Sequence, residues 1–261
     1  MRKILANAWA DMAAGYDRRS VWIALATEDI GDQHRRTTLG PLWLLVNYFA
    51  FAATFIFVFA PVPSAQFAIY VATGLLVWNY MNDSISQAVT LFEREQSFIK
   101  GTNLPLSVYV MRVTLQNIIR GIYAVFGCGV ILVLAQVEIT PAWLWSGLGL
   151  LIILVCSPAV VALFGFLGVF FPDSQFVVTN LMRVAMFATP LFWTHEGEGG
   201  IRGALYYWNP FTYFLDMVRQ PIVDGTVSWN AFGVSILFTL VIWALAVLLL
   251  GIYRRKVALI V

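Results

Sequence analysis

The feature that most constrains this chain is a series of long, uncharged, apolar runs separated by short charged segments. Residues 39–60 contain no charged side chain. At a rise of about 1.5 Å per residue, a helix of this length crosses the roughly 30 Å hydrocarbon core of a bilayer. Further charge-poor runs, one of them interrupted by Arg183, bring the count to six candidate spans and cover residues 67–82, 121–137, 139–172, 174–193 and 227–253.

Composition and pattern together indicate the fold class. Hydrophobic residues make up 60% of the chain and charged residues only 11%, which leaves too little polar surface to cover a soluble domain of this size. The apolar runs continue over many helical turns and do not alternate residue by residue as barrel strands do. We therefore expect an all-α integral membrane protein, with a cytoplasmic tail and interfacial helix at 1–38 and a six-helix transmembrane domain at 39–261.

The distribution of Lys and Arg predicts the orientation of the chain. If the N-terminus is cytoplasmic, eleven cations lie on that side: six in residues 1–38, two in the loop after the second span and three after the last span. The opposite side has only Arg202 and Arg219. This bias places both termini in the cytoplasm, as six spans also require. The net charge of +2 and the scatter of basic residues give no reason to expect a nucleic-acid partner.

Residues 20–36 have the pattern of an amphipathic helix that lies along the cytoplasmic surface of a membrane. Ser20 is a candidate N-cap, an apolar patch follows it, and the segment ends in acidic residues and the basic pair Arg35 and Arg36. A solvated tail without a fixed position is the alternative.

Polar residues at three- and four-residue spacing predict a polar helix face where the second span approaches the cytoplasm. A matching stripe, Arg112, Gln116 and Arg120, leads into the third span. Such side chains face protein, water or one another rather than lipid. Two interpretations stay open: Asp83 pairs with an arginine between helices, or these residues line a water-filled entrance. The first stripe consists of Asn79, Asn82, Asp83, Ser86, Gln87 and Thr90.

The cytoplasmic segment 93–101 carries two apolar residues within a charged sequence. A simple linker does not need Phe98 and Ile99, so the segment is either a connecting loop or a small docking helix for a soluble partner. The charges that would set its specificity are Glu93, Arg94, Glu95 and Lys100.

Aromatic residues gather in two places. Tyr48, Phe51, Phe55 and Phe59 form one stripe on the first span, which serves either as a lipid-facing or packing surface or as a lining on which sugars stack. Residues 194–226 are dense in aromatics, which predicts short re-entrant helices at the outer interface. The candidate site residues of this segment are Tyr207, Trp208, Asn209, Pro210 and Phe211.

The sequence contains no recognisable catalytic or metal-binding pattern. Its two histidines, His34 and His195, would lie on opposite membrane sides, so we expect neither a paired-histidine metal site nor a histidine-based relay. No Gly-Lys pair occurs, which excludes a P-loop ATPase. Cys128 and Cys156 lie within predicted spans, where we expect them to be buried and unpaired.

The order of several short motifs resembles that of the membrane subunits of ABC transporters that export polysaccharides, the O-antigen, capsule and teichoic acid exporter permeases. The resemblance covers nearly the whole chain. Its motifs are Arg35-Arg36-Thr37-Thr38-Leu39-Gly40-Pro41-Leu42-Trp43, Leu104-Pro105-Leu106-Ser107, Phe171-Pro172-Asp173, Ala188-Thr189-Pro190-Leu191, Trp208-Asn209-Pro210-Phe211, Arg219 and Asp224-Gly225.

The resemblance implies a permease subunit that is not an enzyme and holds no cofactor itself. Such permeases form homodimers in the bacterial inner membrane and bind two copies of a separate ATPase, which holds ATP and Mg. They move a lipid-linked polysaccharide from the cytoplasm to the outer face. Residues 93–101 would be the coupling helix that docks on the ATPase, and 194–226 the external gate.

A lipid-linked glycan carries a phosphate or pyrophosphate. We expect its binding residues among Arg35, Arg36, Arg112 and Arg120, with Asp83 at the same entrance; membrane anchoring and pairing with Asp83 are the alternative roles of these arginines. Rival functions are export of teichoic acid, a lipid or a drug by the same architecture, or a membrane enzyme that acts on lipid-linked sugars.

Overall fold

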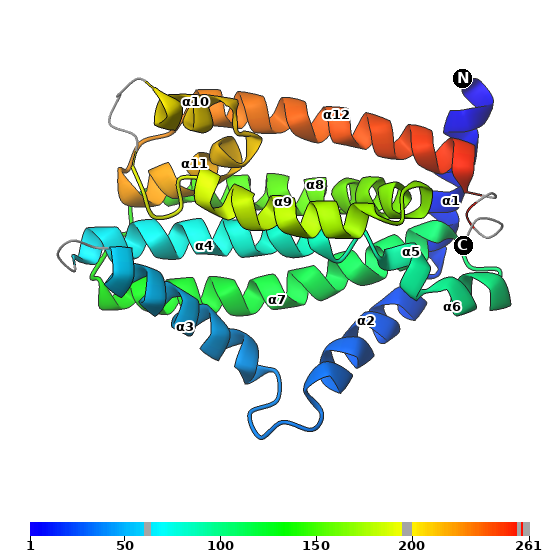
Figure 1. Cartoon of the computed structure of the whole chain (residues 1–261), viewed down its shortest axis with the longest axis horizontal. Helices are drawn as coiled ribbons and strands as arrows, with labels where there is room; N and C mark the ends of the chain where they lie inside the picture. The colour runs from blue at the N-terminus through cyan, green and yellow to red at the C-terminus, as the bar shows by residue number, and fades with distance from the viewer. Residues whose placement is uncertain (60–63, 195–199, 255–256, 258–261) are drawn as a thin grey trace.

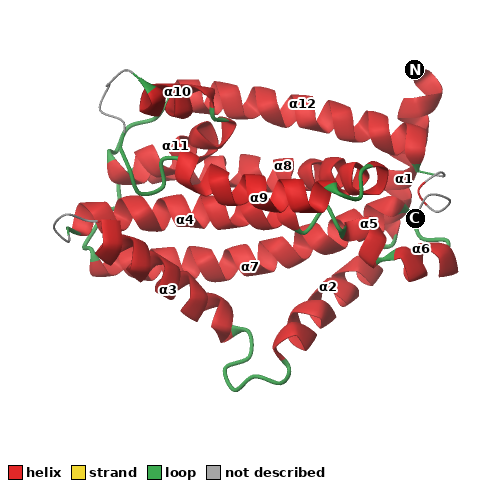
Figure 2. Cartoon of the chain, viewed as in Figure 1, coloured by secondary structure: helices red, strands yellow, loops and turns green. Residues whose placement is uncertain are grey.

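The computed structural model describes residues 1–59, 64–194, 200–254 and 257, and every regular element in these ranges is a helix (Figures 1 and 2). The expectation of an all-α protein is therefore confirmed. The helices are α1 (Arg2–Asp17), α2 (Arg19–His34), α3 (Leu42–Phe59), α4 (Ala65–Ser86), α5 (Leu91–Arg94), α6 (Gln96–Gly101), α7 (Leu106–Leu134), α8 (Trp143–Phe170), α9 (Ser174–Ala188), α10 (Ile201–Trp208), α11 (Pro210–Val223) and α12 (Trp229–Tyr253).

Helices α4, α7, α8, α9 and α12 run along the longest axis of the molecule (Figure 1). One end of the bundle, which we name the terminal end, carries α1, α5, α6 and the last turn of α12. The other, the distal end, carries α10 and the first turn of α4. Helices α2 and α3 each contact α7 and lean away from the bundle toward residues 35–41, which join them.

Four helices in the described part of the chain are long and apolar enough to cross a membrane: α3, α7, α8 and α12. Helix α9 has 15 residues, or about 22 Å, which is shorter than a roughly 30 Å hydrocarbon core. Helix α4 has 22 residues and is more polar. Residues 71–78 of α4 are all buried, because α3, α7, α8, α9 and α11 surround it, and a helix enclosed by protein does not need a lipid-compatible surface.

Helix α7, which corresponds to the third predicted span, begins at Leu106, whereas the uncharged run predicted a start at residue 121. The difference arises because Arg112 and Arg120 lie inside α7. Both guanidinium groups are bound by other side chains of the protein, so their charges do not end the helix.

The N-terminal segment contains the helix expected at residues 20–36, as α2, and a further helix, α1, before it. It forms two helices that meet at Arg18, and Ser20 lies inside α2 and is not its N-cap. Helix α1 is held on the bundle, since Arg254 Nη1 donates to Asn7 O at 2.8 Å and Ser107 N donates to Asp11 Oδ1 at 3.0 Å. The first helix is thus docked rather than a solvated tail.

Pro158 lies within α8, and the helix continues through it. A proline removes the N–H that would bind the carbonyl four residues earlier. Ser157 Oγ donates to that carbonyl, Leu154 O, at 2.9 Å, and Tyr80 Oη of α4 donates to Ser157 Oγ at 2.9 Å. The proline therefore creates a polar contact between α8 and α4 inside an apolar bundle. Cys128 and Cys156 are buried free thiols, as the sequence predicted.

The crossing of α8 with the segment after α4 gives a stability prediction. A Cβ at Gly168 would lie 1.7 Å from Val89 O, whereas a Cβ at Gly147 of the same helix would meet no atom within 4 Å. We expect Gly168→Ala to destabilise the protein by about 1–3 kcal/mol, as overpacking does, and Gly147→Ala to be neutral or stabilising by up to about 1 kcal/mol. The midpoints of thermal unfolding of the two variants in detergent test this; equal midpoints would contradict the close crossing.

Candidate functional site

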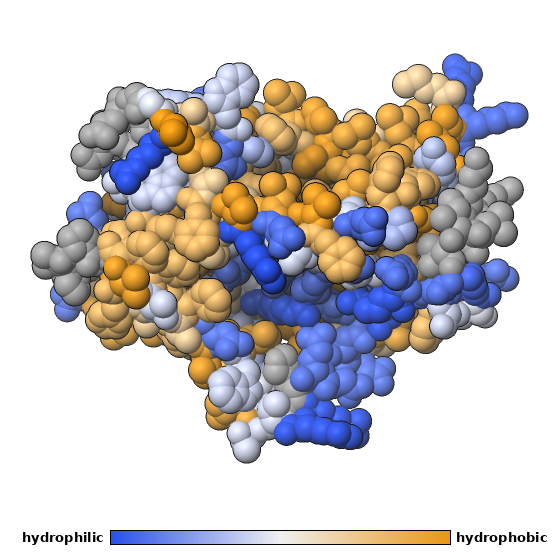
Figure 3. Space-filling view, in the orientation of Figure 1, coloured by the Kyte–Doolittle hydropathy of each residue, from blue (hydrophilic) through white to orange (hydrophobic). Residues whose placement is uncertain are grey.

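Four residues of the predicted polar stripe, Asn79, Asn82, Asp83 and Ser86, lie on α4, whereas Gln87 and Thr90 lie in the turn that follows the helix. The six residues of the stripe are all partly buried, while the residues between them, among them Tyr80, Met81, Ser84 and Ile85, are buried. Figure 3 shows hydrophilic surface across the middle of this side of the molecule, below α9 and toward the terminal end, with hydrophobic surface around it.

A cavity of about 230 Å³ lies where the stripe meets α3 and α7. It brings together two groups of residues that the sequence singled out separately: Asp83 and Arg120 of the predicted entrance, and Tyr48 and Phe51 of the aromatic stripe. The other lining residues are Leu44, Asn47, Asn79, Tyr80, Asn117, Gly121 and Ala124. We name this cavity the α3–α4–α7 cavity.

Arg120 of this cavity is bound by neutral groups. Its Nη1 donates to Asn117 Oδ1 at 3.1 Å and its Nη2 to Gln33 Oε1 at 3.0 Å. None of the ion pairs among the described residues joins Arg120 to Asp83, although both line the cavity. Gln33 belongs to the last turn of α2, so Arg35 and Arg36 follow within three residues of a side chain that contacts Arg120.

Arg112, one of the predicted entrance residues, lies in a separate ionic network. Its Nε and Nη2 donate to Asp29 Oδ2 and Oδ1 at 2.6 and 2.8 Å, and its Nη1 donates to Glu95 Oε2 at 2.7 Å. Gln116 Nε2 also donates to Asp29. Arg112 therefore pairs with Asp29 and Glu95 instead of Asp83, and the network joins α2, α7 and the residue before α6.

The segment 93–101 forms the short helices α5 and α6. Phe98 is 48% exposed, whereas Ile99 is 8% exposed and belongs to the apolar cluster that includes Leu91, Leu106 and Tyr109. Glu95 is buried by its contact with Arg112, and the side chains of Glu93, Arg94 and Lys100 are exposed. The apolar pair is thus divided, because its two residues point to different sides of α6.

The four residues of the aromatic stripe of α3 also differ in exposure. Tyr48 is buried and its Oη donates to Ala72 O at 2.7 Å. Phe55 is buried and stacks on Phe192 with ring centroids 5.0 Å apart. Phe51 and Phe59 are exposed, and of these only Phe51 lines the α3–α4–α7 cavity.

The expected gate segment contains α10 and α11, and its Asn209-Pro210 pair forms their boundary. Asn209 Oδ1 accepts from Phe211 N at 3.0 Å and Pro210 is the first residue of α11, a common arrangement at a helix start. Asn209 Nδ2 also donates to Thr189 Oγ1 at 2.8 Å. Phe211 packs edge-on against Trp78, and Tyr207 and Trp208 are exposed.

Within the described part of the chain, no group of three or more His, Cys, Asp or Glu side chains is placed to hold a metal ion. His195 lies outside the described residues, as do Arg255 and Lys256 of the predicted cytoplasmic cations.

The Arg112 network gives a second stability prediction. Arg112→Gln leaves Asp29 without a cation and Glu95 with only the longer contact to Arg94, whose Nε lies 3.8 Å from Glu95 Oε1. The two carboxylate side chains are only 24% (Asp29) and 10% (Glu95) exposed. We expect a loss of about 2–3 kcal/mol, below the roughly 3–5 kcal/mol of a fully buried pair. Arg202→Gln, at an exposed arginine of α10, is the matched control. Equal unfolding midpoints in detergent would show that the network does not stabilise the fold.

Three curated proteins are similar to this chain in sequence. The O-antigen export system permease protein RfbA of Klebsiella pneumoniae is 24% identical over 225 residues, which are 83% of this chain and 84% of that protein. The polysialic acid transport protein KpsM of Escherichia coli is 23% identical over 257 residues, 93% of this chain and 96% of the relative. RfbA of Myxococcus xanthus is 23% identical over 184 residues, 68% of this chain and 70% of its own length.

The family model of ABC-2 type transporters matches residues 20–223. This match includes α2 to α11 and with them the polar stripe, the Arg112 network and the α3–α4–α7 cavity. The chain therefore belongs to the ABC-2 type transporter family.

Proposed function

We propose that this chain is the permease subunit of an ABC transporter that exports a lipid-linked polysaccharide, of O-antigen or capsule type, across the bacterial inner membrane. The observation that carries the proposal is the α3–α4–α7 cavity, with its amide, carboxylate, guanidinium and aromatic lining, in a member of a family whose similar relatives are named for O-antigen export and polysialic acid transport.

The chemistry of the cavity suits the linkage region of such a substrate. Hydroxyl groups of a glycan exchange hydrogen bonds with side chains such as Asn79 and Asn117, and Phe51 offers a ring face. Arg120 has no direct ion pair among the described residues, so a phosphate oxygen can replace a neutral amide as its partner. Arg35 and Arg36 follow Gln33, which binds Arg120, and would extend this cationic surface toward the headgroups.

Arg112 has a different role in this proposal. All three nitrogens of its guanidinium already donate to carboxylates, so a phosphate would have to displace two charged partners. We assign Arg112 to holding α2 and the coupling segment on α7.

The membrane topology that we propose has six spans, with α4 and α9 completing the four long apolar helices. Residues 71–78 of α4 are enclosed by other helices, its polar residues Asn79 and Asp83 line the α3–α4–α7 cavity, and α9 lies beside α4 and α8. The cation distribution supports a cytoplasmic position for the terminal end and for both termini. Helices α10 and α11 would then be short re-entrant helices at the outer interface.

The assembly that we propose is a homodimer bound to two copies of an ATPase subunit, which holds ATP and Mg. In this assembly α6 is the coupling helix, and Phe98 is its apolar contact because Ile99 is directed into the permease.

Phe98→Asp should remove the ATPase from the purified complex while the permease remains in the membrane. A carboxylate placed in an apolar docking groove costs several kcal/mol, enough to weaken association more than a hundredfold. Co-purification of the ATPase with tagged permease measures this. Phe98→Leu is the matched control and should retain the ATPase, whereas Ile99→Asp should lower the yield of folded permease. Retention of the ATPase by Phe98→Asp would make α6 a connector only.

Deletion of the gene should abolish surface display of one polysaccharide and leave its lipid-linked precursor inside the cell, and the wild-type gene should restore display. Arg120→Lys should lower the restored level severalfold, because lysine keeps the charge but not the planar pair of donors. Quantitative glycan immunoblotting of surface material measures both effects.

Arg202→Lys, which changes an exposed arginine of α10, is the control for this experiment and should restore full display. Unchanged surface polysaccharide in the deletion strain would reject glycan export as the function. Full display with Arg120→Lys would reject only the phosphate-binding role of Arg120.

A further inference from the structure

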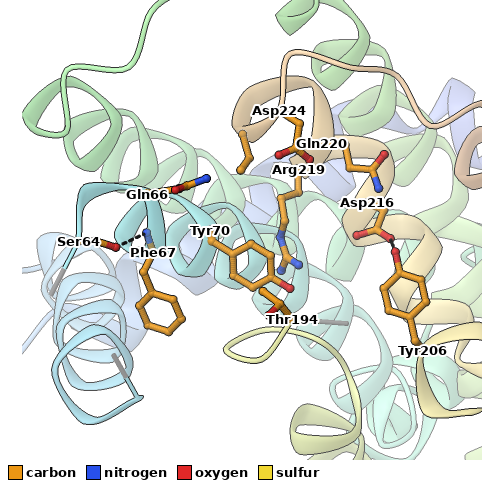
Figure 4. Close-up of a pocket in the computed structure, with 11 residues that line it drawn as sticks. Ser64, Gln66, Phe67, Tyr70, Thr194, Tyr206, Asp216, Arg219, Gln220 and Asp224 are labelled. Carbon is orange, nitrogen blue, oxygen red and sulfur yellow. Dashed lines mark hydrogen bonds between the residues drawn. The ribbon is translucent and has the colours of Figure 1, made fainter. Parts of the chain in front are cut away.

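A second, larger cavity lies at the distal end, between the first turns of α4 and the helices α10 and α11 (Figure 4). Its volume is about 430 Å³, within the roughly 300–1,000 Å³ of small-molecule sites. We name it the distal cavity. It shares no lining residue with the α3–α4–α7 cavity, so it is a separate site.

Arg219 of α11 forms part of the wall and is only 2% exposed. Its guanidinium lies over the Tyr70 ring, 3.8 Å from the centroid, and Nη1 donates to Pro190 O at 2.7 Å. Nε and Nη2 have no acceptor among the described residues. A buried donor without an acceptor costs roughly 1–3 kcal/mol, and more when it is charged. This wall therefore lacks hydrogen-bond acceptors that a bound molecule can supply.

A carboxylate lies nearby but is held by another group. Asp216 precedes Arg219 by three residues on α11, and Tyr206 Oη of α10 donates to Asp216 Oδ2. Figure 4 shows the guanidinium of Arg219 between the Tyr70 ring and this Asp216–Tyr206 pair. Burial raises the pKa of the Asp216 carboxyl, and the positive charge of Arg219 partly opposes that rise.

The charged groups that line the cavity favour a neutral ligand with hydroxyl groups over an anion. Two carboxylates, those of Asp216 and Asp224, and one guanidinium line the cavity, so its net charge disfavours a free anion. A hydroxyl group fits, because it donates to a carboxylate and accepts from Arg219 or from the amide of Gln220. Phe67 and Tyr70 add ring faces to the same wall. Alternating donors and acceptors beside aromatic rings match a neutral, hydroxyl-rich sugar.

We propose that the distal cavity binds one sugar unit of the exported glycan. This inference rests on the proposed function, since it takes the ligand from the cargo of the transporter. The site lies at the end of the bundle that carries few cations, which the proposed topology places outside the membrane. It would hold a unit of the chain after that unit has crossed.

The test uses the complete permease–ATPase complex in lipid nanodiscs. The probe is a set of short, lipid-free oligosaccharides hydrolysed from the surface polysaccharide of the source bacterium, titrated by saturation-transfer difference NMR. Asp216→Asn keeps the shape of the side chain and still accepts from Tyr206, but removes the charge. We expect it to weaken binding about tenfold, the effect of one charged hydrogen bond, and Gln220→Leu to weaken it severalfold.

Glu138→Gln is the matched control, because Glu138 is exposed and does not line the cavity; its affinity should equal that of the wild type. Gln66→Leu, at an exposed lining residue in the first turn of α4, adds a variant that leaves the fold intact and should also weaken binding. Equal affinity of the wild type and all three cavity variants would overturn the sugar site.

If the wild-type gene restores surface glycan in the deletion strain while its purified complex does not bind the oligosaccharides, that result would also overturn the sugar site. It would leave the proposed function standing. If the wild-type gene neither affects surface glycan nor yields a complex that binds the oligosaccharides, both proposals fail.

Discussion

The contact of Arg112 with Asp29 and Glu95 joins three parts of the chain: α7, α2 and the residue before α6. It fixes α2 and the segment before α6 on the same turn of α7. Because the three side chains are largely removed from water, loss of one charge leaves the others poorly solvated, and the pieces are held as a unit. The position of α2 then places Gln33 on Arg120, so the wall of the α3–α4–α7 cavity depends on this network.

This arrangement also gives a physical route from the proposed coupling helix to the cavity. A displacement of α6 acts on Glu95 through the chain and on Arg112 through their hydrogen bond, and the same guanidinium holds Asp29 of α2. Helix α2 ends beside the cavity. Movement of the ATPase would thus reach the proposed substrate site through side chains that are in direct contact.

Helical periodicity was sufficient to predict the polar face of α4 from Asn79 to Ser86, because spacing determines which residues share one side of a helix. It did not predict that the helix ends before Gln87 and Thr90. Charge-free runs were a poorer guide to helix ends: α7 extends well before its uncharged part because Asp29, Glu95, Asn117 and Gln33 bind its arginines. Sequence also could not separate Phe98 from Ile99, or Phe51 from Phe55. Those differences depend on which neighbouring helix covers each side, and tertiary packing decides that.

In each of the two cavities, the arginine of the wall is bound by neutral groups. Arg120 is held by the amides of Asn117 and Gln33, and Arg219 by a carbonyl and the ring of Tyr70, while Asp83 and Asp216 line the same walls without pairing with them. A direct ion pair would leave the guanidinium saturated and closed to a ligand, and an arginine without partners would be too costly inside the bundle. Neutral partners reduce the cost of burying the guanidinium and still leave it able to bind a ligand. They allow a passing hydroxyl or phosphate oxygen to exchange with an existing contact at small net free energy, which suits a path along which each unit of a long glycan must bind and then leave.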